Sequence, residues 1–99
     1  MKDFIRVMKA LADPNRTRIL KLLQKKCLCV CEITDVIKLK QPSVSKHLKI
    51  LENAGLVYFQ KKGRRTCYKI ANGEDNPYAA AIMGNLKHWL NEIEGIRQA

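Results

Sequence analysis

Apolar residues at helical spacing mark two helices at the start of the chain. Those over residues 2–12 share one helical face and are Phe4, Ile5, Met8 and Leu11. The sequence DPNR follows, in which Asp13 can cap free backbone N–H groups and Pro14 suits the first position of a helix. The apolar side of the second helix consists of Ile19, Leu20, Leu22 and Leu23. We therefore predict two consecutive helices before residue 27.

A period of two interrupts the helices at residues 27–31. In the sequence CLCVC, Leu28 and Val30 alternate with three cysteines, which predicts a short extended segment. Cys27, Cys29 and Cys31 would then point to one face, about 6.6 Å apart at about 3.3 Å per residue. Sulfur atoms that share one soft ion must lie closer, because metal–sulfur bonds are about 2.3 Å long. Sharing an ion would therefore require the backbone to curl or the following helix to lose its first turn.

Residues 31–54 form two helices separated by the turn KLKQP. The inward positions of the first, which starts near Cys31 or Glu32, are Ile33, Val36 and Ile37. Pro42 can start a helix but cannot lie inside one, and Gly55 supplies the left-handed residue that ends the second helix. The apolar face of this second helix is Val44, Leu48 and Leu51. In such a helix-turn-helix, the second helix enters the DNA major groove.

Two β-prone runs and a last helix complete the chain. LVYFQ and TCYKI are joined by KKGRR, so residues 56–71 predict a hairpin with Gly63 at its tip. Residues 77–97 carry a long apolar stripe of helical spacing behind Asn76 and Pro77. The 99 residues suffice for one domain. We predict a mainly α fold with a small β-hairpin wing (α+β), a single winged helix-turn-helix domain over residues 1–99 with about five helices.

Charge is concentrated in the middle of the chain. The formal net charge is +10, and residues 38–69 hold nine Lys or Arg but one acid, Glu52, for a net charge of +8. Such clustering favours a nucleic-acid partner over a surface charged only for solubility. No apolar run reaches membrane-spanning length, and the start MKDFIRVMKAL does not have the pattern of a signal peptide. We therefore expect a cytoplasmic protein without membrane association, in which thiols stay reduced.

The candidate DNA contacts are polar residues opposite the apolar face of the second helix, and charged residues of the hairpin. Those on the helix are Gln41, Ser43, Ser45, Lys46, His47 and Lys49. Those on the hairpin are Lys61, Lys62, Arg64 and Arg65. A serine at a helix start is often only a cap, and hairpin tips are often charged for solubility. Their combination favours base and phosphate contacts, with the hairpin as a wing on the backbone or in the minor groove.

Four segments in order resemble the ArsR/SmtB family of bacterial metal-sensing repressors: MKALADPNRTRILKLL, LCVCEI, QPSVSKHLKILENAGLV and KKGRRTCYKI. The resemblance covers roughly residues 5–71 closely and the last helix in character. It implies a cytoplasmic winged-helix homodimer that represses a resistance or efflux operon until an inducer releases it from its double-stranded DNA operator. Many relatives have Gly in the turn where this chain has Lys38, which could take a left-handed conformation at about 1–2 kcal/mol.

The resemblance also implies an inducer. The LCVC motif marks the family's site for arsenite or antimonite, or with extra ligands cadmium and lead, and Cys29 and Cys31 match it. Arsenite-sensing relatives often have a third cysteine where this chain has Thr34, and we infer Cys27 as its replacement. No cysteine precedes Cys27, which argues against cadmium and lead. The last helix has only His88 of the zinc-sensor ligand set, so no zinc site is expected there, and no permanent cofactor is expected.

Other functions remain open. The thiols could form a redox or persulfide switch on the same fold, or be packed and inert in a metal-blind repressor. Cys67 is expected to be a small buried hydrophobe. The basic face could instead meet a protein or RNA, as an interaction module. An enzyme is not expected, because the chain shows no catalytic carboxylate pair, phosphate-binding glycine loop or nucleophile–base signature.

The first and last helices, residues 2–12 and 77–97, have apolar faces that one small domain cannot easily cover. We therefore expect a twofold homodimer formed by these helices. Its two recognition helices would lie roughly 34–36 Å apart, one DNA turn, on a palindromic operator.

Overall fold

The computed structural model describes residues 2–71 together with 78, 81, 82 and 84. The elements in chain order are α1 (Lys2–Leu11), α2 (Pro14–Leu23), β1 (Leu28–Cys29), α3 (Val30–Ile37), α4 (Gln41–Asn53), β2 (Val57–Lys62) and β3 (Arg65–Ile70). This order confirms the mainly helical fold with a hairpin wing. The helix expected over residues 77–97 lies outside the described residues, except for those four positions, which are helical. No helix in the described part of the chain is long and apolar enough to cross a bilayer.

Local chemistry sets the helix ends as the sequence predicted. The Asp13 carboxylate accepts hydrogen bonds from the backbone N–H groups of Asn15 (2.8 Å) and Arg16 (3.2 Å), which caps α2. Gly55 has a φ of 79° after α4 and lets the chain leave the helix in the left-handed region. Lys38 ends α3 with a φ of 66°, the one positive φ among the described residues other than glycine. The left-handed turn at Lys38 is therefore confirmed.

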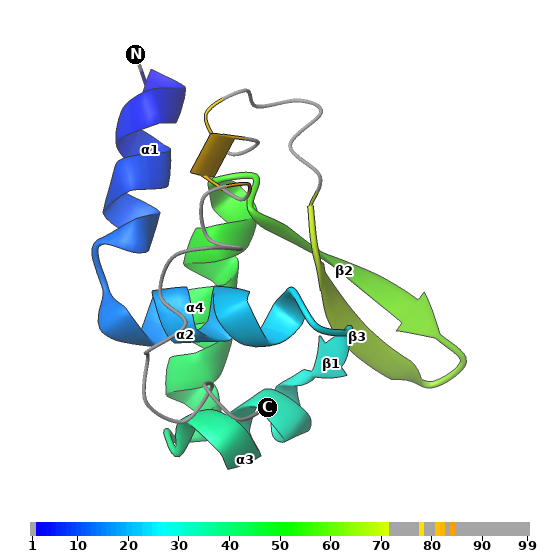
Figure 1. The fold of residues 1–99 in the computed structure, drawn as a ribbon. Helices are drawn as coiled ribbons and strands as arrows, with labels where there is room; N and C mark the ends of the chain where they lie inside the picture. Colours follow the sequence, from blue (N-terminus) through cyan, green and yellow to red (C-terminus); the bar gives the residue numbers. More distant parts are fainter. Residues whose placement is uncertain (1, 72–77, 79–80, 83, 85–99) are drawn as a thin grey trace.

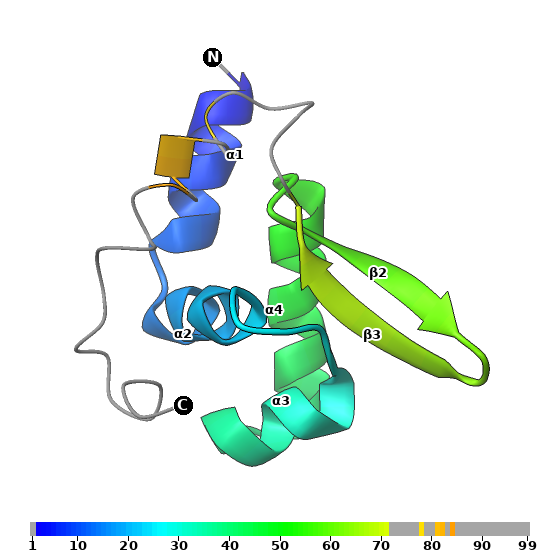
Figure 2. The same cartoon turned by 45° about the vertical axis from the view of Figure 1, so that its right-hand side comes forward.

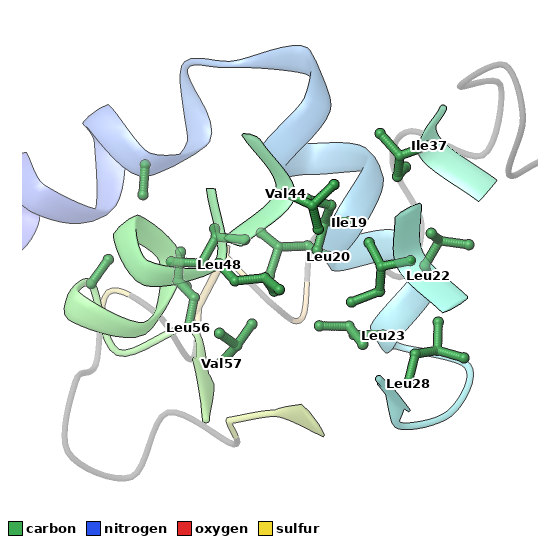
Figure 3. Close-up of a cluster of buried hydrophobic side chains, with 14 of the residues drawn as sticks. Ile19, Leu20, Leu22, Leu23, Leu28, Ile37, Val44, Leu48, Leu56 and Val57 are labelled. Carbon is green, nitrogen blue, oxygen red and sulfur yellow. The ribbon is translucent and has the colours of Figure 1, made fainter. Parts of the chain in front are cut away.

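The core lies between α2, α3, α4 and the start of the hairpin. Figure 1 shows α4 in the centre, with α1 on one side and the hairpin on the other. Side chains from α2 and α4 converge there (Figure 3), and the residues with no exposed surface include Ile19, Leu20, Ile33, Val44, Leu48, Leu51 and Leu56. Burying each such side chain contributes about 1.5–3 kcal/mol. The apolar faces predicted for α2 and α4 are thus confirmed.

Two predicted inward faces were partly wrong. In α3, Val36 is 37% exposed, and Ile33 and Ile37 alone form the buried side. In α1, Phe4 and Ile5 are 38% and 42% exposed, whereas the fully buried positions are Val7 and Ala10. The small alanine side chain lets α1 approach the core on that face, so the larger side chains at the start of the helix remain outside.

The sheet has three strands in the order β1–β3–β2, one more than the predicted hairpin. β2 and β3 are antiparallel with Val57 opposite Ile70 and Lys62 opposite Arg65, so the turn is Gly63–Arg64. Figure 2 shows this hairpin projecting away from the helices. The segment predicted as extended over residues 27–31 was partly wrong, because α3 begins at Val30 and only the first part of the segment pairs with β3.

Candidate nucleic-acid interface and thiol site

The polar face of α4 is open to solvent over the residues predicted to contact DNA. The exposed members are Gln41, Ser43, Ser45, Lys46 and Lys49. They lie opposite the buried Val44, Leu48 and Leu51, because side chains three and four apart share a helix face. Pro42 lies in the first turn, where its missing N–H group costs no helical hydrogen bond. This face can therefore approach a groove, and its role in binding stays a prediction.

His47 differs from these residues, because it is half-buried and has an intramolecular partner. Its Nδ1 lies 3.2 Å from Nη1 of Arg16 in α2. The guanidinium group has only donors, so Nδ1 must accept and the ring proton is on Nε2. Arg16 also donates to the carbonyl oxygens of Ala10 at 2.6 Å and Lys9 at 3.1 Å. Nothing in the sequence pattern indicated this link between the end of α1 and α4.

The wing residues divide into two groups. Lys61 and Arg64 are exposed, and no hydrogen bond or ion pair is found for them among the described residues. Lys62, in contrast, has its Nζ 3.9 Å from the Cys27 sulfur. Arg65 lies at the start of β3 and turns towards α3 instead of occupying the hairpin tip. Only part of the predicted wing cluster is thus free of protein contacts in this structure.

Cys29 lies at the N-terminal cap of α3, where its environment favours a charged sulfur. Its backbone N–H donates to Oε1 of Glu32 at 2.9 Å, and its sulfur accepts the N–H of Glu32, as in a capping box. The Cys31 sulfur lies one half-turn into the helix and is 2.9 Å from the Cys29 sulfur. The expected separation of about 6.6 Å was therefore wrong for this pair, because the helix starts early and already curls the backbone.

The two sulfurs of this pair ionise differently. The contact with Cys31 is the main cause that lowers the pKa of Cys29, and the Glu32 backbone N–H and Arg65 lower it further. The same contact raises the pKa of Cys31, which therefore keeps its proton longer. The pKa of the Glu32 carboxyl is lowered, chiefly because it accepts the Cys29 backbone N–H. The pair therefore offers one thiolate hydrogen-bonded by one thiol.

Arg65 connects this thiol pair to the wing. Its Nη2 donates to the Cys29 sulfur at 3.0 Å and to Oε1 of Glu32 at 3.2 Å. The guanidinium group is two-thirds exposed, so the ion pair with Glu32 is worth little by itself. Its importance is its position, because a single side chain on β3 contacts both the sulfur and the carboxylate at the start of α3.

Cys27, the candidate third thiol, faces a different partner. Its thiol is hydrogen-bonded with that of Cys67 on β3, which lowers the pKa of Cys27, while burial is the main cause that raises the pKa of Cys67. Within the described residues, no group of three or more Cys, His, Asp or Glu side chains is arranged to hold a metal ion. Cys67 is buried as expected, at 8% exposure, but its thiol is paired. The structure thus contains two pairs of thiols.

Comparisons with known proteins agree with this architecture. A sequence model described as "Bacterial regulatory protein, arsR family" matches residues 13–58. The HTH-type transcriptional repressor SmtB of Mycobacterium tuberculosis is 41% identical over 82 residues, which are 83% of this chain and 58% of that protein. The arsenical resistance operon repressor of Bacillus subtilis is 35% identical over 77 residues, 77% of this chain and 73% of that protein. This chain therefore spans less than two thirds of SmtB.

A solved structure extends the likeness to three dimensions. The homodimeric winged helix-turn-helix DNA-binding domain of Mb0332 from Mycobacterium bovis, described as a possible ArsR-family regulator, is 32% identical. The match has a TM-score of 0.76 and covers 92% of this chain and 81% of that one. These matches and the winged helix described above show that the chain belongs to the ArsR/SmtB family of DNA-binding transcriptional regulators, which are not enzymes.

Proposed function

We propose that the protein is a cytoplasmic homodimeric repressor that leaves its double-stranded DNA operator when arsenite, antimonite or another soft thiophilic ion binds its cysteine thiols. The operator would be palindromic and contacted by α4 and the wing. The observation that carries the proposal is the distance of 2.9 Å between the Cys29 and Cys31 sulfurs. Two thiols held together at a helix start suit soft ions, which thiolates select.

The arrangement around Cys29 explains how such an ion would act on DNA binding. A sulfur that becomes a ligand gives up its roles as cap of α3 and as acceptor for Arg65. Losing a cap costs about 1 kcal/mol, at the start of the first helix of the helix-turn-helix. Release of Arg65 also removes the link between α3 and the wing. The ion would therefore favour a state in which α3 and the wing are less firmly placed, as differential binding requires.

The names of two relatives support this class of inducer. The Bacillus subtilis relative is an arsenical resistance operon repressor, and the matched Mycobacterium tuberculosis protein is a repressor. Cys27 remains the proposed third ligand. To join the pair it would have to leave its hydrogen bond with Cys67, and this requirement makes its contribution separately testable.

The test is a titration of reduced, metal-free protein with arsenite, followed by thiol–ligand absorbance. We expect saturable binding that is lost in Cys29→Ser and in Cys31→Ser. Cys27→Ser should bind more weakly, because one proposed ligand is missing. Cys67→Ser is the matched control and should bind arsenite like the wild type, since that sulfur is outside the proposed ligand set.

A second measurement connects binding to release. Anisotropy of a labelled duplex, selected for tight binding to the reduced protein, should fall on addition of arsenite in the wild type but not in Cys29→Ser. If the wild type binds no arsenite, the metalloid proposal is wrong. If release then requires only an oxidant, the protein is a thiol redox or persulfide switch. If release is unchanged in every cysteine variant, it is a metal-blind regulator.

A further inference from the structure

The second thiol pair, Cys27 and Cys67, has no part in the release mechanism as the structure presents it. The two thiols are hydrogen-bonded to each other although their residues come from different parts of the chain. Cys27 directly precedes β1 and is half-buried, whereas Cys67 in β3 is 8% exposed. The pair therefore has one member that solvent can reach and one that it cannot.

Strand register explains why these two sulfurs meet. β1 and β3 are antiparallel, with Cys29 directly opposite Cys67. Side chains two residues apart on a strand point to the same face, so Cys27 lies diagonally across from Cys67 on the face that also carries Cys29. Diagonal neighbours of an antiparallel pair remain within reach of each other. The sheet thus holds the pair in place, so their proximity does not depend on a mobile loop.

Positive charge surrounds the reachable member of the pair. The Nζ atom of Lys62, at the end of β2, lies 3.9 Å from the Cys27 sulfur, and Lys69 adds a second nearby positive charge. Cationic groups beside a partly exposed thiol are the environment of oxidation-sensitive cysteines, and a neighbouring second thiol is the usual resolving partner.

We propose that Cys27 and Cys67 form an oxidisable dithiol, which a hydroperoxide converts into a disulfide between the segment before α3 and the wing. The Cys27 sulfur attacks the distal oxygen of the peroxide, the O–O bond breaks, and the departing alkoxide or hydroxide takes up the thiol proton. Cys67 then attacks the resulting sulfenic sulfur, and the S–O bond breaks with release of water. Two thiols lose two electrons and two protons, and the hydroperoxide becomes an alcohol, or water, plus water.

The competing pair would lose more on oxidation. A Cys29–Cys31 disulfide would draw the Cys29 sulfur away from the N–H of Glu32 and from the Arg65 guanidinium. A Cys27–Cys67 disulfide breaks only the contact between Cys27 and Lys62. The Cys29 sulfur is also less accessible, because that residue is 7% exposed. Both arguments place the oxidisable pair at Cys27 and Cys67.

Tryptic digestion separates these alternatives cleanly. Cleavage after Lys26 and Lys38 leaves Cys27, Cys29 and Cys31 on one peptide, residues 27–38, and cleavage after Arg65 and Lys69 leaves Cys67 on residues 66–69. The reduced protein is treated with hydrogen peroxide, its remaining thiols are alkylated, and the digest is analysed without reduction. We expect residues 27–38 disulfide-linked to residues 66–69, with two alkylated thiols on the longer peptide.

Matched variants identify which cysteine is linked. Cys27→Ser should abolish the linked peptide, whereas Cys31→Ser should retain it at the wild-type yield. In Cys67→Ser, a sulfenic acid should accumulate on Cys27 and be captured by dimedone. The proposal is wrong if residues 27–38 acquire an internal disulfide and no link, if the link persists in Cys27→Ser, or if peroxide leaves all thiols reduced. None of these results depends on arsenite, so this inference and the proposed function fail separately.

Discussion

Single residues carry strain and capping that can be tested directly. Lys38 has a left-handed backbone at the end of α3, with a φ of 66° and a ψ of 35°. An L-residue with a Cβ atom is disfavoured there, whereas glycine adopts this conformation readily. The turn between α3 and α4 therefore stores a small amount of strain at the position that sets the angle between the two helices.

Lys38→Gly should stabilise the protein. We expect the free energy of unfolding in urea to rise by about 0.5–1 kcal/mol, because relief of the left-handed strain exceeds the extra chain entropy of glycine in the unfolded state. Lys46→Gly, on the exposed face of α4, is the control and should lower the free energy of unfolding by about 1 kcal/mol. A lower stability in both variants would contradict this account.

Residue-level chemistry was predictable where it is local. Asp13 and Gly55 act within their own turns of the chain, so their roles could be assigned from the neighbouring letters. The partners of Arg65 and Cys27 lie more than 30 positions away, and no spacing rule connects them. For that reason Arg65 was assigned only to DNA and Cys67 only to the core, and neither prediction anticipated the contacts with thiols.

Elements communicate through one arginine. Arg16, in the first turn of α2, joins the last carbonyls of α1 to His47 on α4. The helix proposed to form the dimer and the helix proposed to contact DNA are therefore connected by a single side chain. Since the guanidinium group is planar and rigid, a shift of α1 would be felt at α4.

Arg16→Ala should destabilise the fold by about 1–3 kcal/mol, because it leaves carbonyl oxygens and His47 without their donor. Arg6→Ala, at an exposed position of α1, should change stability by less than about 0.5 kcal/mol. A double-mutant cycle with His47→Ala should give a coupling energy of at least about 0.5 kcal/mol. Additive effects in urea denaturation would show that the two side chains act independently.

The early start of α3 had a signal that periodicity concealed. Cys29 followed three residues later by Glu32 has the spacing of a capping box, with cysteine in place of serine or threonine. The alternation of CLCVC outweighed this pattern and predicted an extended segment over residues 27–31. The pairing of β1 with β3 could not be predicted either, because a run of two residues has too short a pattern to specify a partner.

At the scale of the molecule, the basic middle of the chain predicts salt-dependent DNA binding. Each phosphate neutralised by a side chain contributes about 0.9 to the slope of log K against log salt. We expect Arg64→Gln to reduce that slope by about 0.9 on non-specific duplex DNA, measured by anisotropy. Arg65→Gln should reduce it less, because the Arg65 guanidinium is held by Cys29 and Glu32. A larger effect at Arg65 would contradict this.

The exposed apolar residues of α1 predict a dimer. Phe4 and Ile5 are 38% and 42% exposed, and we expect sedimentation at about twice the monomer mass of 11.4 kDa. Ile5→Lys should raise the dimer dissociation constant by about tenfold to a hundredfold, since burial of one isoleucine contributes about 1.5–3 kcal/mol. Val36→Lys is the control, because Val36 is similarly exposed on α3. Monomeric wild type at micromolar concentration would disprove the dimer.

The pairing of Leu28 with Tyr68 has a consequence for the order of folding. β1 can pair only after α3, α4 and the hairpin have brought β3 back, because the residues it joins lie far apart in the sequence. On the ribosome, the cysteines of residues 27–31 therefore emerge long before their partners on β3. A newly made chain carries its thiols uncovered until the wing closes, so the cell's reductants and free metal ions meet these cysteines before the finished repressor does.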